Sequence, residues 1–486
     1  MGRKQPPEPH KLIPKDTSDI ITQTREYELI TPLFGGGAVP GEADEDLPIR
    51  GTEIRGQLRF WWRACRGGLT KKNQKERNIR SNEQILADML ARENAIWGAA
   101  TKHKEEIHKQ EQGEVQRRLN TVYLSIEVLN ENRGEPINAY IVRETRGGNG
   151  KRKFVPYPIR DIPGYASFPL QPSQKELQTA LTPHDVPLKE VRKGIIFTLT
   201  ISYHKDYKED VEAALWAWET FGGVGARTRR GFGALRCLSI NGDPELVNLA
   251  PSQSDQVIGW LNERLKDHVI VGTWPSHVPY LPKEFGEGTD IVIFKTSTSG
   301  EENKALYEIW NRLIQGLKDF RQSKRRQESV WPETHFINYL KNNPTSPTDY
   351  KGLKKFPKAQ FGLPIVFPLH NNKHPNNIKR KDSQLHLQPN THERFSSPII
   401  LKPIACESGC YKGFALLLKG SRLERGSLIL HLIEEQTKEK KEIGTFETYL
   451  AEPEQVLISS GHSFSIVTDK GKNTLRAFME FMSKRR

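Results

Sequence analysis

The sequence predicts an α+β fold, and three observations support this class. Residues 122–128 alternate apolar and polar side chains, which is the period-two pattern of a β-strand. Residues 52–65 and 209–221 carry apolar side chains at three- and four-residue intervals, the pattern of an amphipathic helix. Strand and helix patterns alternate through the first half of the chain. At 486 residues the chain is too long for one hydrophobic core, so we expect two domains with insertions.

The first predicted elements are a strand and a helix, joined through a glycine-rich turn. Residues 21–31 (ITQTREYELIT) are rich in strand-forming side chains, and the turn 34–37 (FGGG) ends them. A helix follows from about residue 52, with one apolar face made of Ile54, Leu58, Trp61, Trp62 and Cys65. An adjacent stripe has the same spacing and consists of Arg55, Arg59, Arg63 and Arg66. Glu53 is the only acidic residue near this stripe in sequence. We therefore expect the helix to pack by one face, with both tryptophans in the core, and to present guanidinium groups from the other.

The remaining elements of the first half complete a recognisable order. They are a helix at 81–97, strands at 122–128, 139–144 and 194–203, a helix at 209–221 and a strand at 234–240. If insertions are ignored, the order is β-α-β-β-α-β. This is the ferredoxin-like pattern, a four-stranded antiparallel sheet with two helices on one face. RNA-recognition modules bind RNA on the open face of such a sheet.

The second half predicts another sheet-and-helix unit. Residues 241–255 (NGDPELVNLAPSQSD) have the composition of a linker, so we expect an N-terminal domain over 1–245 and a C-terminal domain over 256–486. Expected elements of the latter are helices at 256–267, 304–320 and 474–482 and strands at 291–295, 398–404, 413–418 and 428–433. Between about 321 and 393 the composition shifts toward Asn, Pro, Lys and His, which predicts long polar loops.

The net charge favours an anionic partner. Lys and Arg number 73 against 59 Asp and Glu, a formal charge of +14, and the pI is near 9.4. This balance favours nucleic acid over an acidic membrane surface. The four scattered cysteines do not suggest a disulfide framework, and no apolar leader or long apolar run is seen. We expect a cytoplasmic protein without membrane contact.

The most informative segment is 220–233 (TFGGVGARTRRGFG), which combines five glycines, three arginines and two aromatic residues. Glycine lets a backbone approach a ligand closely, arginine supplies a fork of donors for phosphate, and an aromatic ring can stack on a base. An ordinary helix end followed by a turn would explain Gly222 and Gly223 alone. It would not explain three arginines between further glycines, because guanidinium groups repel one another unless an anion lies between them. The segment therefore indicates contact with RNA.

Other chemistry has little support in the sequence. No G-x-x-x-x-G-K-[ST] or G-x-G-x-x-G pattern is present, so we expect no nucleotide cofactor. Cys406 and Cys410 lack a second pair of ligands for zinc, and the acidic residues 42–46 are interpreted as a solvated turn, so no metal site is expected. His204 and His462 are the candidates for acid-base work in RNA cleavage.

Several of these segments together resemble the RAMP superfamily of CRISPR effector proteins. They look most like the first subunit of type III-B, or Cmr, complexes. In the first half the resemblance rests on 31–37 (TPLFGGG), 48–56 (PIRGTEIRG), 58–63 (LRFWWR) and 222–233 (GGVGARTRRGFG). In the second half it rests on 361–365 (FGLPI) and 394–401 (RFSSPIIL).

The resemblance implies two ferredoxin-like domains in tandem with long insertions, and a subunit without its own active site. Such a subunit lies at the end of a ribonucleoprotein filament, where the 3′ region of the guide RNA meets target RNA, beside other RAMP subunits. Two alternatives stay open. One is a metal-independent endoribonuclease that processes guide precursors, and the other is a scaffold whose basic loop packs against an acidic neighbouring subunit.

The predicted RNA-binding site combines the first helix with the glycine-rich segment. We expect the two to converge into one positive groove for RNA phosphates, although they are far apart in sequence. The expected contact residues are Arg50, Arg55, Arg59, Arg63, Gly222, Gly223, Gly225, Arg227, Arg229, Arg230, Gly231, Phe232 and Gly233.

Overall fold

The computed structural model describes most of the chain. The described residues are 18–37, 41–70, 81–99, 122–148, 150–295, 302–322, 324–325, 328–329, 331–343, 347–352, 354–369, 383–389, 394–420, 428–434, 440–446 and 474–486. The stretch 101–120 and His462 lie outside the described residues, as does much of 321–393.

The N-terminal sheet is antiparallel, with strand order β3-β7-β1-β8. Its strands are β1 (Ile20–Leu29), β3 (Tyr123–Glu127), β7 (Glu190–His204) and β8 (Leu235–Ile240), and β4 (Arg133–Asn138) pairs with the first part of β7. In register, Tyr27 of β1 lies opposite Phe197 of β7 and Cys237 of β8. Buried residues alternate along β1 and β7, so one face of the sheet packs against helices. Strand and helix occur in the predicted β-α-β-β-α-β order, apart from insertions.

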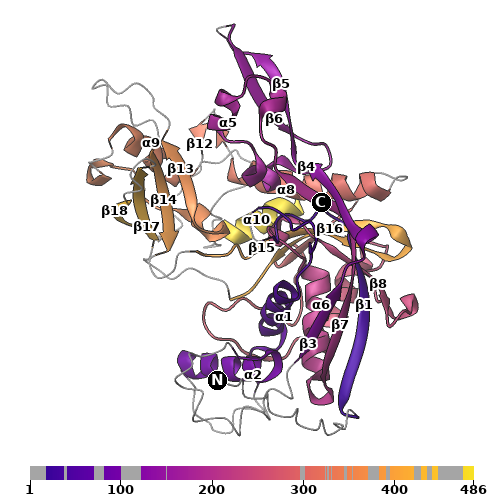
Figure 1. The fold of residues 1–486 in the computed structure, drawn as a ribbon. Helices are drawn as coiled ribbons and strands as arrows, with labels where there is room; N and C mark the ends of the chain where they lie inside the picture. The colour runs from indigo at the N-terminus through magenta and orange to yellow at the C-terminus, as the bar shows by residue number, and fades with distance from the viewer. Residues whose placement is uncertain are drawn as a thin grey trace, which may run out of the picture.

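Two helices cover this face (Figure 1). Helix α1 (Gly51–Arg66) contacts α6 (Lys208–Phe221), and both place tryptophans in the core. The predicted burial of Trp61 and Trp62 is confirmed, since they are 2% and 0% exposed. Helix α2 (Asn82–Trp97) packs against α1 and begins with a capping box formed by Ser81 and Gln84.

A second sheet has the order β10-β16-β15 within the described residues. Its strands are β10 (Ile291–Phe294), β15 (Ile399–Ala405) and β16 (Tyr411–Leu417), packed with α8 (Glu302–Arg321) and α10 (Thr474–Ser483). Every residue of β15 and β16 is buried. Both faces of β15 are therefore covered, one by α8 and the other by α6 and the turn at Thr228–Arg230. The predicted helices and strands of this unit are all present.

The predicted strand 428–433 belongs to a different sheet. Strands β13 (Ile365–Leu369), β14 (Ser383–Pro389), β17 (Leu428–Glu434) and β18 (Lys440–Phe446) pair in that order. With α9 (Pro332–Asn342) they enclose their own hydrophobic cluster, which includes Phe336, Phe356 and Leu430. The polar stretch 321–393 therefore contributes a helix and two strands to a separate unit (Figure 1), because apolar residues are spaced through it.

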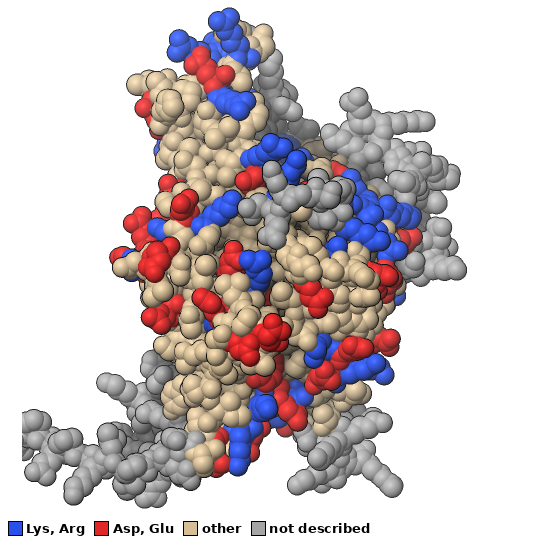
Figure 2. All heavy atoms as spheres, turned by 90° about the vertical axis from the view of Figure 1, so that its right-hand side faces the viewer, with Lys and Arg blue, Asp and Glu red and all other residues tan. Residues whose placement is uncertain are grey.

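A hairpin of β5 (Tyr140–Arg146) and β6 (Arg152–Pro158) projects from the body (Figure 1), and Lys and Arg gather at its outer end (Figure 2). The predicted strand 139–144 thus lies outside the N-terminal sheet. The short helices α4 (Gly164–Ser167) and α5 (Gln174–Thr179) both pack against β6, and α5 lies near the hairpin turn. Helix α7 (Gln256–His268) follows the linker, and β2 (Leu69–Thr70) pairs with β9 (Gly272–Thr273). The short strands β11 (Lys324–Arg325) and β12 (Glu328–Ser329) pair with each other. Among the described helices, none combines the length and apolar character needed to span a bilayer.

Candidate nucleic-acid interface

The glycine-arginine loop, residues 222–233, joins α6 to β8 and folds back on itself. Val224 N donates to Gly233 O at 3.0 Å, and Ala226 N donates to Phe34 O at 2.7 Å in the turn after β1. Gly225, Gly231 and Gly233 have φ values of 83°, 85° and 59°, in the region that favours glycine. A Cβ atom on Gly233 would lie 1.9 Å from the carbonyl oxygen of Val224. Glycine is therefore required at this position by the loop's own closure.

Helix α1 and the loop contact each other, whereas the predicted groove shared by the helix and loop arginines stays a prediction. Glu53 of α1 accepts a hydrogen bond from the main-chain N–H of Gly225 through Oε1. The guanidinium carbon of Arg229 lies 5.2 Å from the ring centroid of Phe60 on the same helix. Burial raises the pKa of Glu53, and its Oε2 has no hydrogen-bond partner among the described residues. The role of Glu53 as the carboxylate that holds the loop is a function that sequence analysis missed.

The arginine stripe is better compensated than the sequence suggests. Glu93 of α2, which is 3% exposed, accepts from Arg59 Nε and from Arg63 Nη1, both at 2.6 Å. Arg55 donates to the carbonyl oxygen of Trp97 at 2.9 Å. Glu53 is the only acidic residue near the stripe in sequence, but the carboxylate that compensates the stripe is that of Glu93, which comes from another helix. Arg59 and Arg63 are thus held by a carboxylate, and Arg55 by a carbonyl.

The pairing with Glu93 predicts a stability effect. Glu93→Gln removes the negative charge between two guanidinium groups, so we expect it to lower the free energy of unfolding by about 2 kcal/mol. Urea denaturation of the two proteins measures the difference. Glu263→Gln on α7, which alters an exposed carboxylate, is the control and should change stability by less than about 0.5 kcal/mol. Equal effects of the two substitutions would contradict the assigned pairing.

The loop arginines bond to main-chain carbonyl groups. The acceptors are the oxygens of Ala166 for Arg227 (2.9 Å), of Ser397 for Arg229, and of Ile399 for Arg230 (2.8 Å). Ile399 begins β15 and Ser397 lies just before it. Trp310 Nε1 of α8 donates back to Arg230 O at 2.7 Å. The loop is therefore also a contact between the two sheets.

These arginines belong to a cation cluster that consists of Arg227, Arg229, Arg230 and Arg321. Burial, followed by the repulsion of Arg321, Arg227 and Arg229, lowers the pKa of Arg230 to about 9. Burial lowers the pKa of Arg229 to about 10, and burial with repulsion by Arg321 lowers that of Arg227. Within the described part of the chain, no carboxylate forms an ion pair with any of the four. The three loop arginines thus retain uncompensated positive charge, whereas Arg321 also lies within electrostatic reach of the buried carboxyl group of Glu333.

Arg321 was not expected from the sequence. It is the last residue of α8, and its guanidinium carbon lies 5.9 Å from the ring centroid of Phe361. The only signal in the sequence is its place at the head of the basic run 321–326 (RQSKRR). The cluster therefore draws its charge from both halves of the chain.

The other predicted site residues make contacts within the protein itself. Phe232 is fully buried and makes edge-to-face contacts with Phe34 and Trp310, at centroid distances of 5.3 and 4.9 Å. Its ring packs in the core instead of facing a ligand. Arg50 is the N-cap residue of α1 and is half-buried. Gly222 and Gly223 form the close turn after α6, where an added Cβ would meet Trp61 or Gly233.

The residues considered for catalysis or metal binding lie outside the glycine-arginine loop. His204 ends β7, with Asp206 Oδ2 3.2 Å from its Nδ1 and Asp19 Oδ2 3.8 Å from its Nε2. All four cysteines are free thiols. No three His, Cys, Asp or Glu side chains gather as a metal site within the ranges that the structure describes.

Comparison with known proteins identifies the class of the N-terminal half. Residues 26–236 match the family model of the RAMP superfamily, so the segment from β1 to β8 is a RAMP-superfamily module. This confirms the resemblance inferred from the motifs of that segment. No curated protein matches the chain.

Among solved structures, the chain is similar to proteins of type III-B complexes. The crystal structure of Cmr1 from Pyrococcus furiosus in its apo form shares 14% identity, with 83% of this chain and 89% of that chain covered and a TM-score of 0.42. A chain in a type III-B Cmr-beta complex bound to cognate target RNA shares 12% identity, with 96% and 99% covered and a TM-score of 0.44. A chain in Cmr-beta with target RNA, AMPPnP and single-stranded DNA shares 14% identity, covers 84% and 96%, and has a TM-score of 0.43.

Proposed function

We propose that the chain is a non-catalytic, RNA-binding subunit of a type III-B CRISPR ribonucleoprotein. It would cap the complex in the cytoplasm, beside other RAMP subunits, and contact the 3′ region of the guide RNA, the target RNA or both. Four free thiols suit a reducing compartment. The single observation that carries the proposal is the cation cluster, whose arginines lie together without a carboxylate partner among the described residues.

The cation cluster suits phosphate better than a protein surface of mixed charge. Arginine offers several N–H donors, and each loop arginine spends only one or two on carbonyl oxygens. A phosphate beside Arg227 and Arg321 would relieve the repulsion that lowers the pKa of Arg227. Such contacts give affinity with little sequence preference, as suits a protein whose specificity comes from pairing between guide and target.

We further propose that the chain contains two ferredoxin-like units. The order β3-β7-β1-β8, with α1 and α6 on one face, supports the assignment for the N-terminal sheet. The second unit has the same succession of elements along the chain, namely β10, α8, β15, β16 and α10. Its strands pair in the order β10-β16-β15. The unit formed by α9, β13, β14, β17 and β18 is then an insertion within the second ferredoxin-like unit.

Two substitutions test the RNA proposal without disturbing the contact between the sheets. Arg227→Gln with Arg321→Gln removes two charges but keeps the bonds of Arg229 and Arg230 to Ser397 and Ile399. We expect single-stranded RNA to bind about tenfold more weakly, and the salt slope to fall by about 0.7 for each lost phosphate contact. Fluorescence anisotropy with labelled RNA, from about 50 to about 200 mM salt, measures both.

The control is Lys266→Gln, which removes a positive charge from the exposed side of α7 and should leave RNA affinity within about twofold. Unchanged affinity in the double variant would contradict the proposal. Crosslinking of the loop to a protein subunit, and never to RNA, would favour the scaffold alternative. Arg229→Ala with Arg230→Ala would be a less specific test, because both residues also bond to the segment that leads into β15.

Among the described residues, the position of His204 gives the endoribonuclease alternative no support. Arg192 of β7 pairs with Leu33, next to the turn that holds the loop, whereas His204 ends the same strand. At ~3.3 Å per residue, the strand separates the two by about 40 Å. Incubation with labelled repeat RNA in EDTA tests the alternative, and we expect no defined cut. A cut that His204→Ala abolishes would overturn the non-catalytic assignment.

A further inference from the structure

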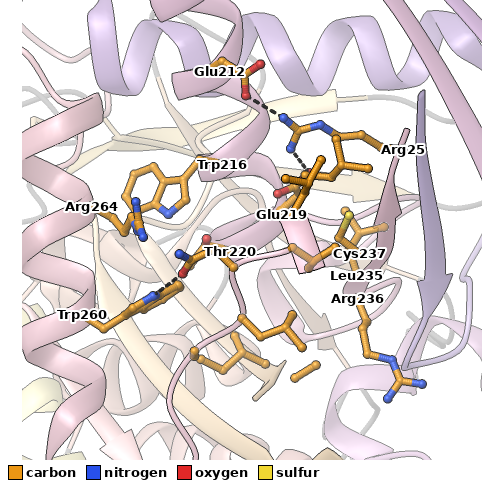
Figure 3. Close-up of a pocket in the computed structure, with 18 of the residues that line it drawn as sticks. Arg25, Glu212, Trp216, Glu219, Thr220, Leu235, Arg236, Cys237, Trp260 and Arg264 are labelled. Atoms are coloured by element: carbon orange, nitrogen blue, oxygen red, sulfur yellow. Dashed lines mark hydrogen bonds and ion pairs between the residues drawn. The ribbon is translucent and has the colours of Figure 1, made fainter. Parts of the chain in front are cut away.

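A pocket with no assigned role lies where α6, α7 and β8 meet, beside the end of β15. Its volume is about 190 Å³. Its walls include Arg25, Trp216, Arg236, Trp260 and Arg264 (Figure 3), together with His268. Drug-sized sites occupy roughly 300–1,000 Å³, whereas a water molecule takes about 30 Å³. The pocket is therefore of a size for a single ring system. None of these residues belongs to the cation cluster.

The aromatic side chains of the wall are held in fixed positions. The rings of Trp216 and His268 stack with centroids 4.9 Å apart and an interplanar angle of 23°. Burial lowers the pKa of His268 to about 4, so this stack is uncharged at neutral pH. Trp260 donates from Nε1 to Asn248 Oδ1 at 2.7 Å. The wall thus offers flat, neutral rings of the kind on which nucleobases stack.

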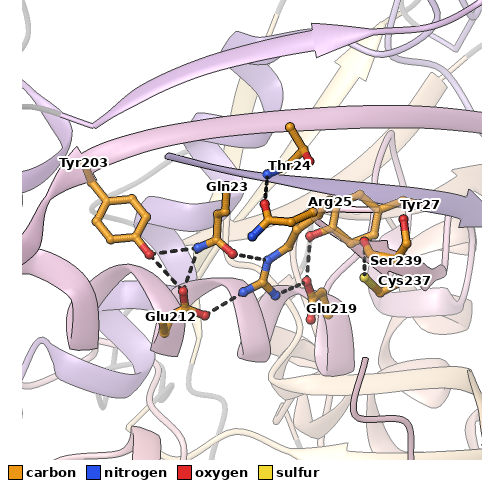
Figure 4. A network of polar contacts seen from close by, with 10 residues as sticks. Gln23, Thr24, Arg25, Tyr27, Tyr203, Glu212, Glu219, Cys237 and Ser239 are labelled. Carbon is orange, nitrogen blue, oxygen red and sulfur yellow. Dashed lines mark hydrogen bonds and ion pairs between the residues drawn. The ribbon is translucent and has the colours of Figure 1, made fainter. Parts of the chain in front are cut away.

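The carboxylates of the wall are already engaged. Glu212 accepts from Arg25 at 2.6 Å and from Tyr203 at 2.9 Å, and Glu219 accepts from Arg25 at 2.8 Å and from Tyr27 at 2.6 Å (Figure 4). These bonds belong to a network between β1, β7 and α6. A ligand in the pocket would therefore find both carboxylates occupied by donors of the protein.

Donors, by contrast, are left over. Trp216 Nε1, Arg236 Nε and Arg264 Nε are buried and have no hydrogen-bond partner among the described residues. Trp216 is 8% exposed, and it lies with Arg264 on one side of the pocket in Figure 3. The carboxylate nearest to Arg264, that of Asp267, is 3.6 Å away, beyond a good hydrogen bond. These three nitrogen atoms have almost no accessible surface, so a ligand in the pocket would instead reach the guanidinium end of Arg264, whose side chain is 33% exposed. This group offers several N–H donors to a ligand that brings acceptors.

We propose that this pocket binds a guanine base, stacked against its aromatic wall and hydrogen-bonded to Arg264. Guanine presents two neighbouring acceptors, O6 and N7, on one edge, and this edge matches the fork of an arginine. Adenine offers one acceptor beside a donor, and cytosine offers a donor at the equivalent edge. The base can come from a free nucleotide or from an RNA strand. This inference goes beyond the proposed RNA contact at the cation cluster and does not depend on it.

Calorimetric titration of the full chain with guanosine, adenosine and uridine monophosphates tests the proposal. We expect guanosine monophosphate to bind at least about tenfold more tightly than the other two. Arg264→Gln should reduce that affinity by about tenfold, and Arg264→Lys should also reduce it because lysine lacks the fork. The side chain of Arg264 is 33% exposed, so both variants should fold, which thermal melting would verify. Lys266→Gln, on the same helix but outside the pocket, is the matched control.

A second titration distinguishes the two sources of the base. Oligouridylate with one internal guanosine is added to the protein saturated with guanosine monophosphate, and plain oligouridylate serves as its control. Displacement only by the guanosine-containing strand supports a base presented by RNA, and displacement by neither strand supports a free nucleotide. Equal affinity for all three nucleotides, absence of binding, or an Arg264→Gln variant that binds like the unsubstituted protein would overturn the proposal.

Discussion

Replacement of Gly233 by alanine is expected to lower the free energy of unfolding by at least about 3 kcal/mol. The residue has φ of 59°, which costs an alanine strain in itself. The larger effect is steric, because the new Cβ would lie 1.9 Å from Val224 O and 2.9 Å from Val224 C. These are main-chain atoms of the loop's own closure, so they cannot rotate away. Urea denaturation followed by tryptophan fluorescence measures the loss.

A second alanine substitution provides the comparison. Gly56 lies inside α1, and a Cβ placed on it meets no atom within 4 Å. Gly56→Ala should raise stability by about 0.5–1 kcal/mol, because glycine is a poor helix former. A Gly233→Ala protein as stable as the unsubstituted one would show that the loop has another conformation. RNA binding in the same variant should fall with the loop's structure, since Arg227 and Arg230 lie within it.

Most elements of the fold could be predicted from local patterns. Helices α1 and α6 have apolar residues at helical spacing, and β1 and β7 have one face buried against them, so period and burial agree. The separate unit that contains β17 could not be predicted in this way. Leu428, Leu430 and Leu432 are apolar at alternate positions, but that pattern does not say which sheet they join.

The candidate site was predictable in its backbone and less so in its contacts. Glycines that the loop requires are visible in the sequence, as is the approach of α1. Partners of the arginines are not, because Glu93 belongs to another helix and Ser397 lies in the other half of the chain. Phe232 resembles a stacking residue in sequence, yet it fills the space between Phe34 and Trp310. The spacing of residues along the chain predicts which side chains are neighbours within one helix or strand. It does not predict which side chains meet between different elements.

The glycine-arginine loop has two roles, and the same residues serve both. Arg229 and Arg230 join α6 and β8 to the start of β15, and Thr31 Oγ1 donates to Gly231 O at 2.7 Å on the other side. Buried guanidinium groups bonded to carbonyl oxygens keep their charge, because burial leaves the pKa of Arg229 at about 10 and that of Arg230 at about 9. A contact between sheets therefore also supplies positive potential at their junction, where Arg321 adds to it.

Lys402 is expected to make the stability of this junction rise with pH. The side chain is fully buried on β15 and donates to Glu219 O at 2.8 Å and Thr220 O at 3.1 Å, at the C-terminal end of α6. Burial lowers its pKa to about 7 from the usual 10.5. Between these values the unfolded chain binds a proton that the folded protein largely lacks, so the free energy of unfolding increases with pH.

Lys402→Met isolates this contribution, since methionine does not titrate and the other titrating groups are shared by both proteins. The stability of the unsubstituted protein relative to Lys402→Met should therefore rise by about 1.4 kcal/mol per pH unit, or about 3 kcal/mol from about pH 7.5 to about pH 9.5. Urea denaturation at the two pH values measures it. Leu401→Val is a neighbouring substitution in the same buried strand. It should lower the free energy of unfolding by the same amount at both pH values. If the stability difference between the unsubstituted protein and Lys402→Met does not change with pH, the buried amine is equally protonated in the folded and unfolded chains. In that case the helix-end carbonyl groups would hold the ammonium form as well as water does.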